Sequence, residues 1–123
     1  MERLKQRADF LAAAGALKVP SSSFVLQARD RSDQGPARVG FTVSRKVGNA
    51  VERNRVRRRL RELVRLNSLD ALRPGHDYVL VGRRSALSAA FSDLAADYAR
   101  AISRIHSMRR KPRPEQPDPR PVS

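Results

Sequence analysis

The order of apolar and polar residues predicts three helices and three strands. Helices are expected at residues 7–14, at 49–67 and after Ser88, which can cap the last one. Strands are expected at the alternating or apolar stretches 21–29, 38–44 and 77–82. The order α-β-β-α-β-α predicts an α+β fold, an α-β sandwich with a small mixed sheet. An extra short strand is expected where 21–28 or 36–39 subdivides.

The first two strands have one apolar face each, which indicates a shared core. These faces comprise Phe24, Leu26, Ala28, Val39, Phe41 and Val43. Val25, Gln27 and Thr42 point to the opposite side of the predicted sheet. Residues 30–36 are rich in Asp, Ser, Gly and Pro, so an antiparallel hairpin is the expected pairing of the two strands.

The chain ends and the end of the first helix follow simpler patterns. Residues 1–6 are short and basic, and we expect a mobile arm. Gly15 can end the first helix in a left-handed conformation. Residues 109–123 are rich in proline and arginine and cannot bury a core, so they predict a disordered tail that follows one domain at 1–108.

The predicted helix at 49–67 has the most distinctive pattern. Asn49 is a good N-cap, and Glu52 stands where a capping box places its acid. The buried stripe is expected to consist of Val56, Leu60, Leu63 and Val64. At about 100° per residue, a neighbouring face gathers Asn54, Arg57, Arg58, Arg61 and Arg65. Arg55 and Arg59 fall on the far side, and Arg53 lies near the apolar border.

Charge turns this helix into a candidate nucleic-acid surface. The chain of 123 residues has 26 basic and 12 acidic residues, a net charge of +14. A protein this basic favours a polyanionic partner, and guanidinium groups grip phosphates and stack on bases. No cysteine is present, so disulfides and thiol nucleophiles are excluded. Without a signal peptide or a run of ~20 apolar residues, a cytoplasmic protein with no membrane contact is expected.

Other readings were weighed against RNA binding. A solvated helix face normally mixes charge signs, whereas this face is almost entirely arginine. A zipper-type DNA binder needs sustained apolar heptads, and this chain reaches Asn67 and Pro74 too soon. His76 and His106 stand outside any ligand pattern. We therefore predict no catalytic residue and no metal ligand in the protein.

Extended motifs resemble the bacterial ribonuclease P protein component. They are RVGF at residues 38–41, SRKVGNAV at 44–51, RNR at 53–55, and the arginines that follow up to Arg61-Glu62. The pairs Asp9-Phe10 and Asp77-Tyr78 also match that family. The similarity covers about residues 3–108.

The resemblance implies a fold like domain 2 of ribosomal protein S5, with a left-handed β-α-β crossover. It also implies an auxiliary role. A catalytic RNA subunit, with Mg²⁺ held mainly by RNA and substrate, cuts the 5′ leader from precursor tRNA, and the protein binds both RNAs. No organic cofactor and no obligate protein partner are expected. A stand-alone nuclease and a structural ribosomal protein remain as alternatives.

The resemblance also assigns residues to two surfaces. The surface for the RNA subunit is expected to comprise Lys46, Asn49, Arg53, Asn54, Arg55, Arg57, Arg58 and Arg61. The leader is expected in a cleft between the sheet and the first helix, formed by Phe10, Val25, Gln27 and Thr42. Ala14 and Gln27 stand where the family often has aromatic residues, so fewer rings are available for stacking.

Overall fold

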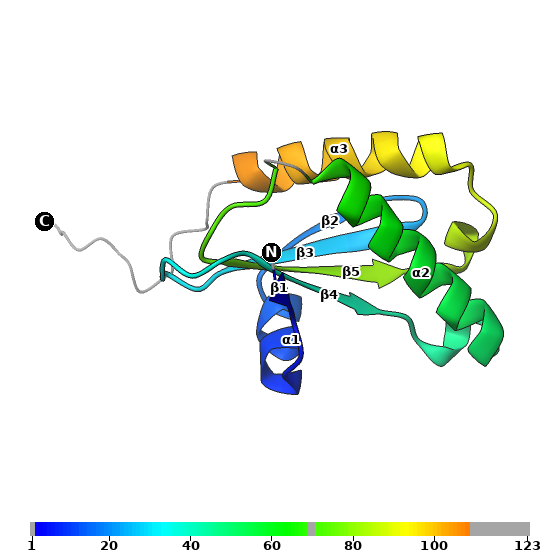
Figure 1. Ribbon diagram of the computed structural model, residues 1–123, viewed down its shortest axis with the longest axis horizontal. Helices are drawn as coiled ribbons and strands as arrows, with labels where there is room; N and C mark the ends of the chain where they lie inside the picture. The colour runs from blue at the N-terminus through cyan, green and yellow to red at the C-terminus, as the bar shows by residue number, and fades with distance from the viewer. Residues whose placement is uncertain (1, 69–70, 109–123) are drawn as a thin grey trace, which may run out of the picture.

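The computed structural model describes residues 2–68 and 71–108. A five-stranded mixed sheet forms the middle layer of an α+β sandwich (Figure 1). One helix lies on one face and two lie together on the other. The helices are α1 (Arg7–Ala14), α2 (Ala50–Asn67) and α3 (Phe91–Ser107), with 3₁₀ turns η1 (Arg45–Val47) and η2 (Arg84–Leu87). The predicted tail at 109–123 lies outside the described residues.

The strand order is β1-β4-β5-β3-β2. The strands are β1 (Glu2–Arg3), β2 (Leu17–Pro20), β3 (Phe24–Asp30), β4 (Arg38–Thr42) and β5 (His76–Gly82). β4 is parallel to β1 and to β5, whereas β3 is antiparallel to β5 and to β2. The parallel pair β4 and β5 is joined through α2, so the predicted β-α-β unit is present, and its left hand stays a prediction.

The predicted hairpin between the first two long strands is wrong, because β5 lies between β3 and β4. Tyr78, Val79 and Leu80 of β5 are buried, and a strand that is apolar on both faces is favoured in the centre of a sheet. β3 instead forms its hairpin with β2, a strand that the pattern did not predict. The extra strand therefore precedes Ser21 and does not subdivide 21–28 or 36–39.

The N-terminal arm is also corrected. Glu2 and Arg3 form β1 beside β4, with Glu2 N donating to Ala37 O at 2.8 Å. Leu4 is only 4% exposed, and its burial explains why the basic arm is held against the sheet. Residues 2–4 thus belong to the fold.

Two helix ends differ from expectation, although all three helices are confirmed. Gly15 ends α1 with a φ of −90°, which is not left-handed. Ser88 follows η2, and α3 begins after Ala90 without a side-chain cap. α2 begins after Asn49 and ends at Asn67, as predicted.

Apolar side chains fill both faces of the sheet. The larger core lies under α2 and α3 and includes Phe24 and Leu26, as the alternation predicted. α2 packs closely enough that a Cβ on Gly82 would lie 2.7 Å from Val56 Cγ1. The smaller core under α1 consists of Leu4, Ala13 and Val79, with Phe10 and Val81 packed against it. No helix in the described ranges is long and apolar enough to span a membrane.

Candidate nucleic-acid interface

The start of α2 is held by a complete capping box. Asn49 Oδ1 accepts the N–H of Glu52 at 2.8 Å, and Glu52 Oε1 accepts the N–H of Asn49 at 3.0 Å. Arg84 donates to the Glu52 carboxylate and to Val47 O, the latter at 2.6 Å. Hydrogen bonds from Arg84 and from the Asn49 backbone lower the pKa of Glu52. The cap therefore fixes where the arginine helix begins, and it occupies the carboxamide oxygen of Asn49.

The predicted buried stripe of α2 is confirmed, since its four residues are at most 2% exposed. Beside it, Arg58 and Arg61 are exposed and Arg57 is half-buried. Arg57 donates to Asn54 Oδ1 at 2.8 Å, and the Arg61 guanidinium lies 5.9 Å from the centroid of the Phe41 ring. Arg58 has no ion pair or side-chain hydrogen bond within the described part of the chain. This face offers guanidinium groups to phosphates.

Three other arginines of α2 donate to backbone carbonyls. Arg59 donates to Ala86 O and Ala89 O, both at 2.6 Å. Arg55 donates to Leu87 O at 3.4 Å, and Arg53 donates to Gly48 O at 3.2 Å. The arginines expected on the far side of the helix thus contact η2 and the segment after it, and Arg59 has a structural role that helical spacing alone did not reveal.

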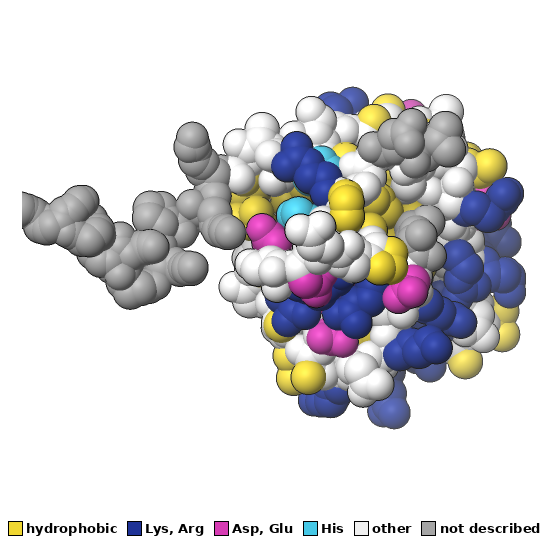
Figure 2. All heavy atoms as spheres, turned by 60° about the vertical axis from the view of Figure 1, so that its left-hand side comes forward, with side chains coloured by type: hydrophobic (Ala, Val, Ile, Leu, Met, Phe, Trp, Pro, Cys, Tyr) yellow, Lys and Arg dark blue, Asp and Glu magenta, His cyan; other side chains and the backbone are white. Residues whose placement is uncertain are grey.

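All eight residues assigned to the RNA subunit lie in η1 and the first turns of α2. Lys46 is exposed in η1, immediately before the cap residue Asn49. Basic side chains gather along one side of the face shown in Figure 2. The structure therefore brings this set together as one continuous segment.

The four residues assigned to the leader share the face that α1 covers. Val81 of β5 is in register with Val25 of β3 on one side and with Thr42 of β4 on the other. In the next row, Val79 lies between Gln27 and Gly40. Sequence reasoning missed the two valines of β5, because the strand order that places them at the centre is not a local signal.

Phe10 lies over the row that contains Gly40. A Cβ on Gly40 would lie 2.5 Å from Phe10 Cε1 and Cζ, so only glycine leaves room for the ring. Thr42 is exposed and Val25 is half-buried, whereas Gln27 is only 9% exposed. The open part of this face therefore comprises Thr42, Val81 and Val25, beside a partly buried Phe10.

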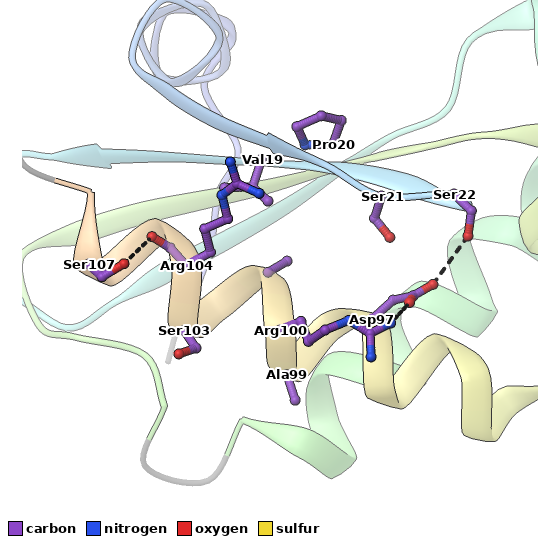
Figure 3. Close-up of a pocket in the computed structure, with 11 residues that line it drawn as sticks. Val19, Pro20, Ser21, Ser22, Asp97, Ala99, Arg100, Ser103, Arg104 and Ser107 are labelled. Carbon is purple, nitrogen blue, oxygen red and sulfur yellow. Dashed lines mark hydrogen bonds and ion pairs between the residues drawn. The ribbon is translucent and has the colours of Figure 1, made fainter.

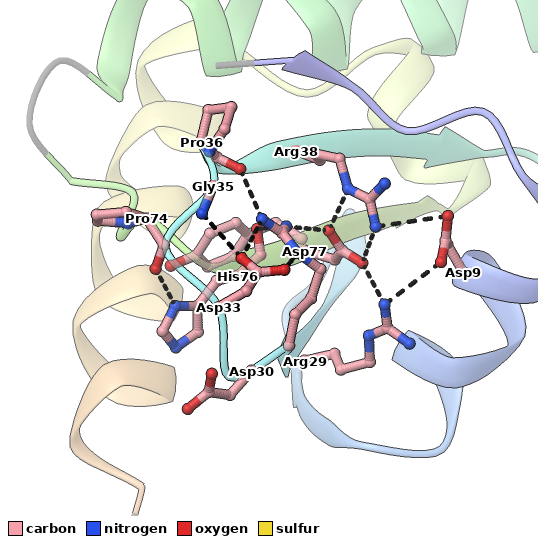
Figure 4. A network of polar contacts seen from close by, with 12 residues as sticks. Asp9, Arg29, Asp30, Asp33, Gly35, Pro36, Arg38, Pro74, His76 and Asp77 are labelled. Carbon is pink, nitrogen blue, oxygen red and sulfur yellow. Dashed lines mark hydrogen bonds and ion pairs between the residues drawn. The ribbon is translucent and has the colours of Figure 1, made fainter.

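A buried carboxylate anchors α1 to the sheet (Figure 4). Asp77 is fully buried and accepts hydrogen bonds from Arg29, Arg31 and Arg38 at 2.6–2.9 Å. Arg29 and Arg38 also reach Asp9 of α1, at 3.3 and 3.4 Å. Burial alone would raise the pKa of Asp77, but hydrogen bonds from Arg38 and Arg31 outweigh it and lower that pKa. The network fixes α1, and with it Phe10, against β3 and β4.

A groove of about 670 Å³ lies between the β2–β3 turn and α3 (Figure 3). Ser22 Oγ donates to Asp97 Oδ2 at 3.2 Å, and Asp97 also pairs with Arg100. Arg104 lines the same groove. Across the described residues, no group of three or more His, Asp or Glu side chains is arranged to hold a metal ion.

Comparison with known proteins agrees with both surfaces. The family model for ribonuclease P matches residues 1–106. The ribonuclease P protein component of Gluconacetobacter diazotrophicus is 52% identical over 101 residues, which cover 81% of this chain and 87% of that protein. The component from Ruegeria pomeroyi is 52% identical over 108 residues, which cover 85% of this chain and 86% of that one.

Solved structures show the same fold. The ribonuclease P protein from Thermotoga maritima superposes with a TM-score of 0.71 at 28% identity, covering 85% of this chain and 98% of that chain. The Staphylococcus aureus protein gives a TM-score of 0.70 at 25% identity, covering 84% and 94%. Because the family model spans nearly all described residues and the relatives share half their sequence, the chain belongs to the ribonuclease P protein family.

Proposed function

We propose that this protein is the protein subunit of the ribonuclease P ribonucleoprotein. It binds the catalytic RNA through the arginine face of α2 and the 5′ leader of precursor tRNA on the α1 face of the sheet. It thereby assists the RNA-catalysed cut that gives the mature 5′ end of tRNA.

One observation supports this proposal most directly: adjacent residues of β4 serve both surfaces. Phe41 lies under the Arg61 guanidinium on the α2 side, and Gly40 lies under Phe10 on the α1 side. A single strand thus separates a phosphate-binding surface from a more apolar one. Two RNA molecules bound on these surfaces would be held within one sheet thickness of each other.

The chemistry of the two surfaces suits two different RNA structures. Exposed guanidinium groups on one helix face suit the dense phosphates of a folded RNA. A surface of Thr42, Val81 and Val25 beside a ring suits unpaired bases, which present apolar faces without a readable groove. Such contacts have little sequence preference, which fits a leader of variable sequence.

Magnesium is proposed to be held by the RNA subunit and the substrate. The described residues offer no cluster of carboxylates or imidazoles for a metal ion, whereas RNA supplies phosphate oxygens that magnesium prefers. The ion would supply Lewis-acid chemistry at the cut phosphate when bound. The protein, at +14, lowers the repulsion between two polyanions and should reduce the magnesium concentration that their association requires.

Cleavage of a leader-bearing precursor tRNA at low magnesium tests the proposal. The cognate ribonuclease P RNA alone, the protein alone and the mixture are compared, with RNA activity at high magnesium as the control. We expect activity at low magnesium only in the mixture. Cleavage by the protein alone would indicate a nuclease, and failure of the folded protein to rescue an active RNA would favour a structural role on another RNA, such as ribosomal RNA.

A further inference from the structure

A second recess opens at the end of the sheet where β3 ends and β5 begins. Its volume is about 880 Å³. Apolar side chains from β2, β3 and α3 line it, namely Leu17, Ala28, Ile105 and Met108. Figure 2, which brings this end of the molecule forward, shows hydrophobic surface beside histidine and basic side chains.

Basic side chains line the same recess. Lys18, Arg29 and Arg73 stand against a single acid, Asp30, whose carboxylate accepts the N–H of Ser32 at 2.8 Å. Arg29 is committed to the Asp77 network. Lys18 and Arg73 are exposed and make no ion pair in the described part of the chain. They are therefore free to bind an anion.

Both histidines of the chain line this recess. His106 Nε2 lies 2.7 Å from the Tyr78 hydroxyl, which also accepts the backbone N–H of Arg73 at 3.0 Å. Burial, with the charges of Arg73 and His76, lowers the pKa of His106 to about 4. Its imidazole is therefore neutral at pH 7, a planar ring with no charge that an RNA base would have to displace.

From this combination we infer that the recess binds one nucleotide of unpaired RNA, with its base on the apolar lining and its phosphate on Arg73 and Lys18. The inference rests on the proposed function for its partner. A purely apolar ligand would leave the two cations unused, and an inorganic anion would leave the apolar lining bare. A nucleotide satisfies both.

The recess is continuous with the predicted leader surface. Lys18 of β2 is in register with Gln27 of β3, which pairs with Val79 and so belongs to the row under Phe10. Arg29, two residues beyond Gln27, lines the recess and also contacts Asp9 of α1. An RNA strand that crosses the α1 face can thus reach the recess along β2 and β3. A loop of the RNA subunit is the other source of such a nucleotide.

Imidazole NMR signals offer a direct test, because both histidines lie at the recess. Histidine-labelled full-length protein is titrated at pH 7 with adenosine 5′-monophosphate and, separately, with ribose 5-phosphate. We expect both imidazole signals to move with the nucleotide and much less with the sugar phosphate. Because His106 is far from its pKa, the movement reports contact and not protonation. Signals that stay still, or that move equally with both probes, would overturn the inference.

A charge-matched pair of variants locates the phosphate contact. Arg73→Ala removes the guanidinium but keeps the backbone N–H that binds Tyr78, so the fold should persist. It should weaken nucleotide binding about fivefold. Arg104→Ala, an exposed arginine that lines the groove of Figure 3 and not the recess, should leave the affinity unchanged. Equal losses in both variants would mean that only overall charge matters, which would overturn the site.

Crosslinking in the assembled ribonucleoprotein identifies the source of the nucleotide. 4-Thiouridine is placed at single positions of the leader, or in unpaired loops of the RNA subunit, and crosslinked peptides are mapped. A crosslink to residues 15–18 or 105–108 supports the recess and names its RNA. Absence of any such crosslink, with cleavage at low magnesium intact, would overturn the recess while the proposed function stands.

Discussion

The ring of Phe10 occupies the space that a side chain on Gly40 would need, with Cε1 and Cζ 2.5 Å from an ideal Cβ at that position. Gly40→Ala should therefore push α1 away from β4. Overpacking of this kind costs about 1–3 kcal/mol, and a lower free energy of unfolding in urea would show it.

The same substitution should also weaken binding of precursor tRNA, because Phe10 moves with α1. The double variant Gly40→Ala with Phe10→Leu serves as the control, since the smaller side chain restores the space. Recovery of stability in the double variant would support the steric account. A double variant that is even less stable would contradict it.

Phe10→Ala should weaken holoenzyme binding to precursor tRNA more than to mature tRNA. A stacked base typically contributes about 1–3 kcal/mol, so a loss of fivefold or more is expected for the precursor alone. Ala13→Gly, in the same helix and buried in the same core, is the control for a general loss of α1 packing. Equal losses on both tRNAs would mean that Phe10 serves only the core.

Arg57→Ala and Arg61→Ala should weaken binding to the RNA subunit and reduce its salt dependence. Each lost phosphate contact lowers the magnitude of the slope of log K against log salt by about 1. Arg59→Ala is the matched control on the same helix. Because Arg59 binds Ala86 O and Ala89 O, its loss should lower the melting temperature and leave the slope unchanged. A slope that Arg57→Ala and Arg61→Ala do not alter would remove them from the interface.

Asp77→Asn should destabilise the fold by about 3–5 kcal/mol, because it leaves buried guanidinium groups without their carboxylate. Asp33→Asn, which removes a half-exposed partner of Arg31, should change stability far less. Thermal or urea unfolding of the two variants gives the comparison. Similar stability of both would contradict a structural role for the Asp77 network.

The same network predicts acid sensitivity. The pKa of Asp77 is lowered in the folded state, so its contribution is complete above the unfolded value of about 3.9 and disappears as pH falls through the folded value. Urea unfolding from pH 6 to pH 2 should therefore show stability falling below about pH 4. In Asp77→Asn this fall should be shallower, and an identical fall in both proteins would assign the acid sensitivity to other carboxylates.

Local signals predicted α2 almost completely. The Asn49–Glu52 box and the stripe from Val56 to Val64 depend on residues within a few turns of each other, and both are confirmed. The faces of β3 and β4 were also predicted, since alternation is local. This is why Phe41 and Gly40 could be assigned to opposite sides of the sheet before their contacts were known.

Strand order could not be predicted in the same way. The insertion of β5 between β3 and β4 depends on contacts between segments roughly fifty residues apart in sequence, for which a short turn at 30–36 was a misleading guide. β1 and β2 are too short to show a period. The buried Asp77 network was equally hidden, because its four charged members come from three separate strands and the turn after β3.

The central position of β5 also orders events during synthesis. β3 and β4 leave the ribosome first, yet each must wait for residues 76–82 before it gains the partner that both share. At about 5–20 residues per second this delay lasts seconds. During that time α2 lacks the β5 backbone on which Val56 packs, while its arginines are already outside. The nascent chain therefore presents its cationic segment to nearby RNA before the domain can close around a core.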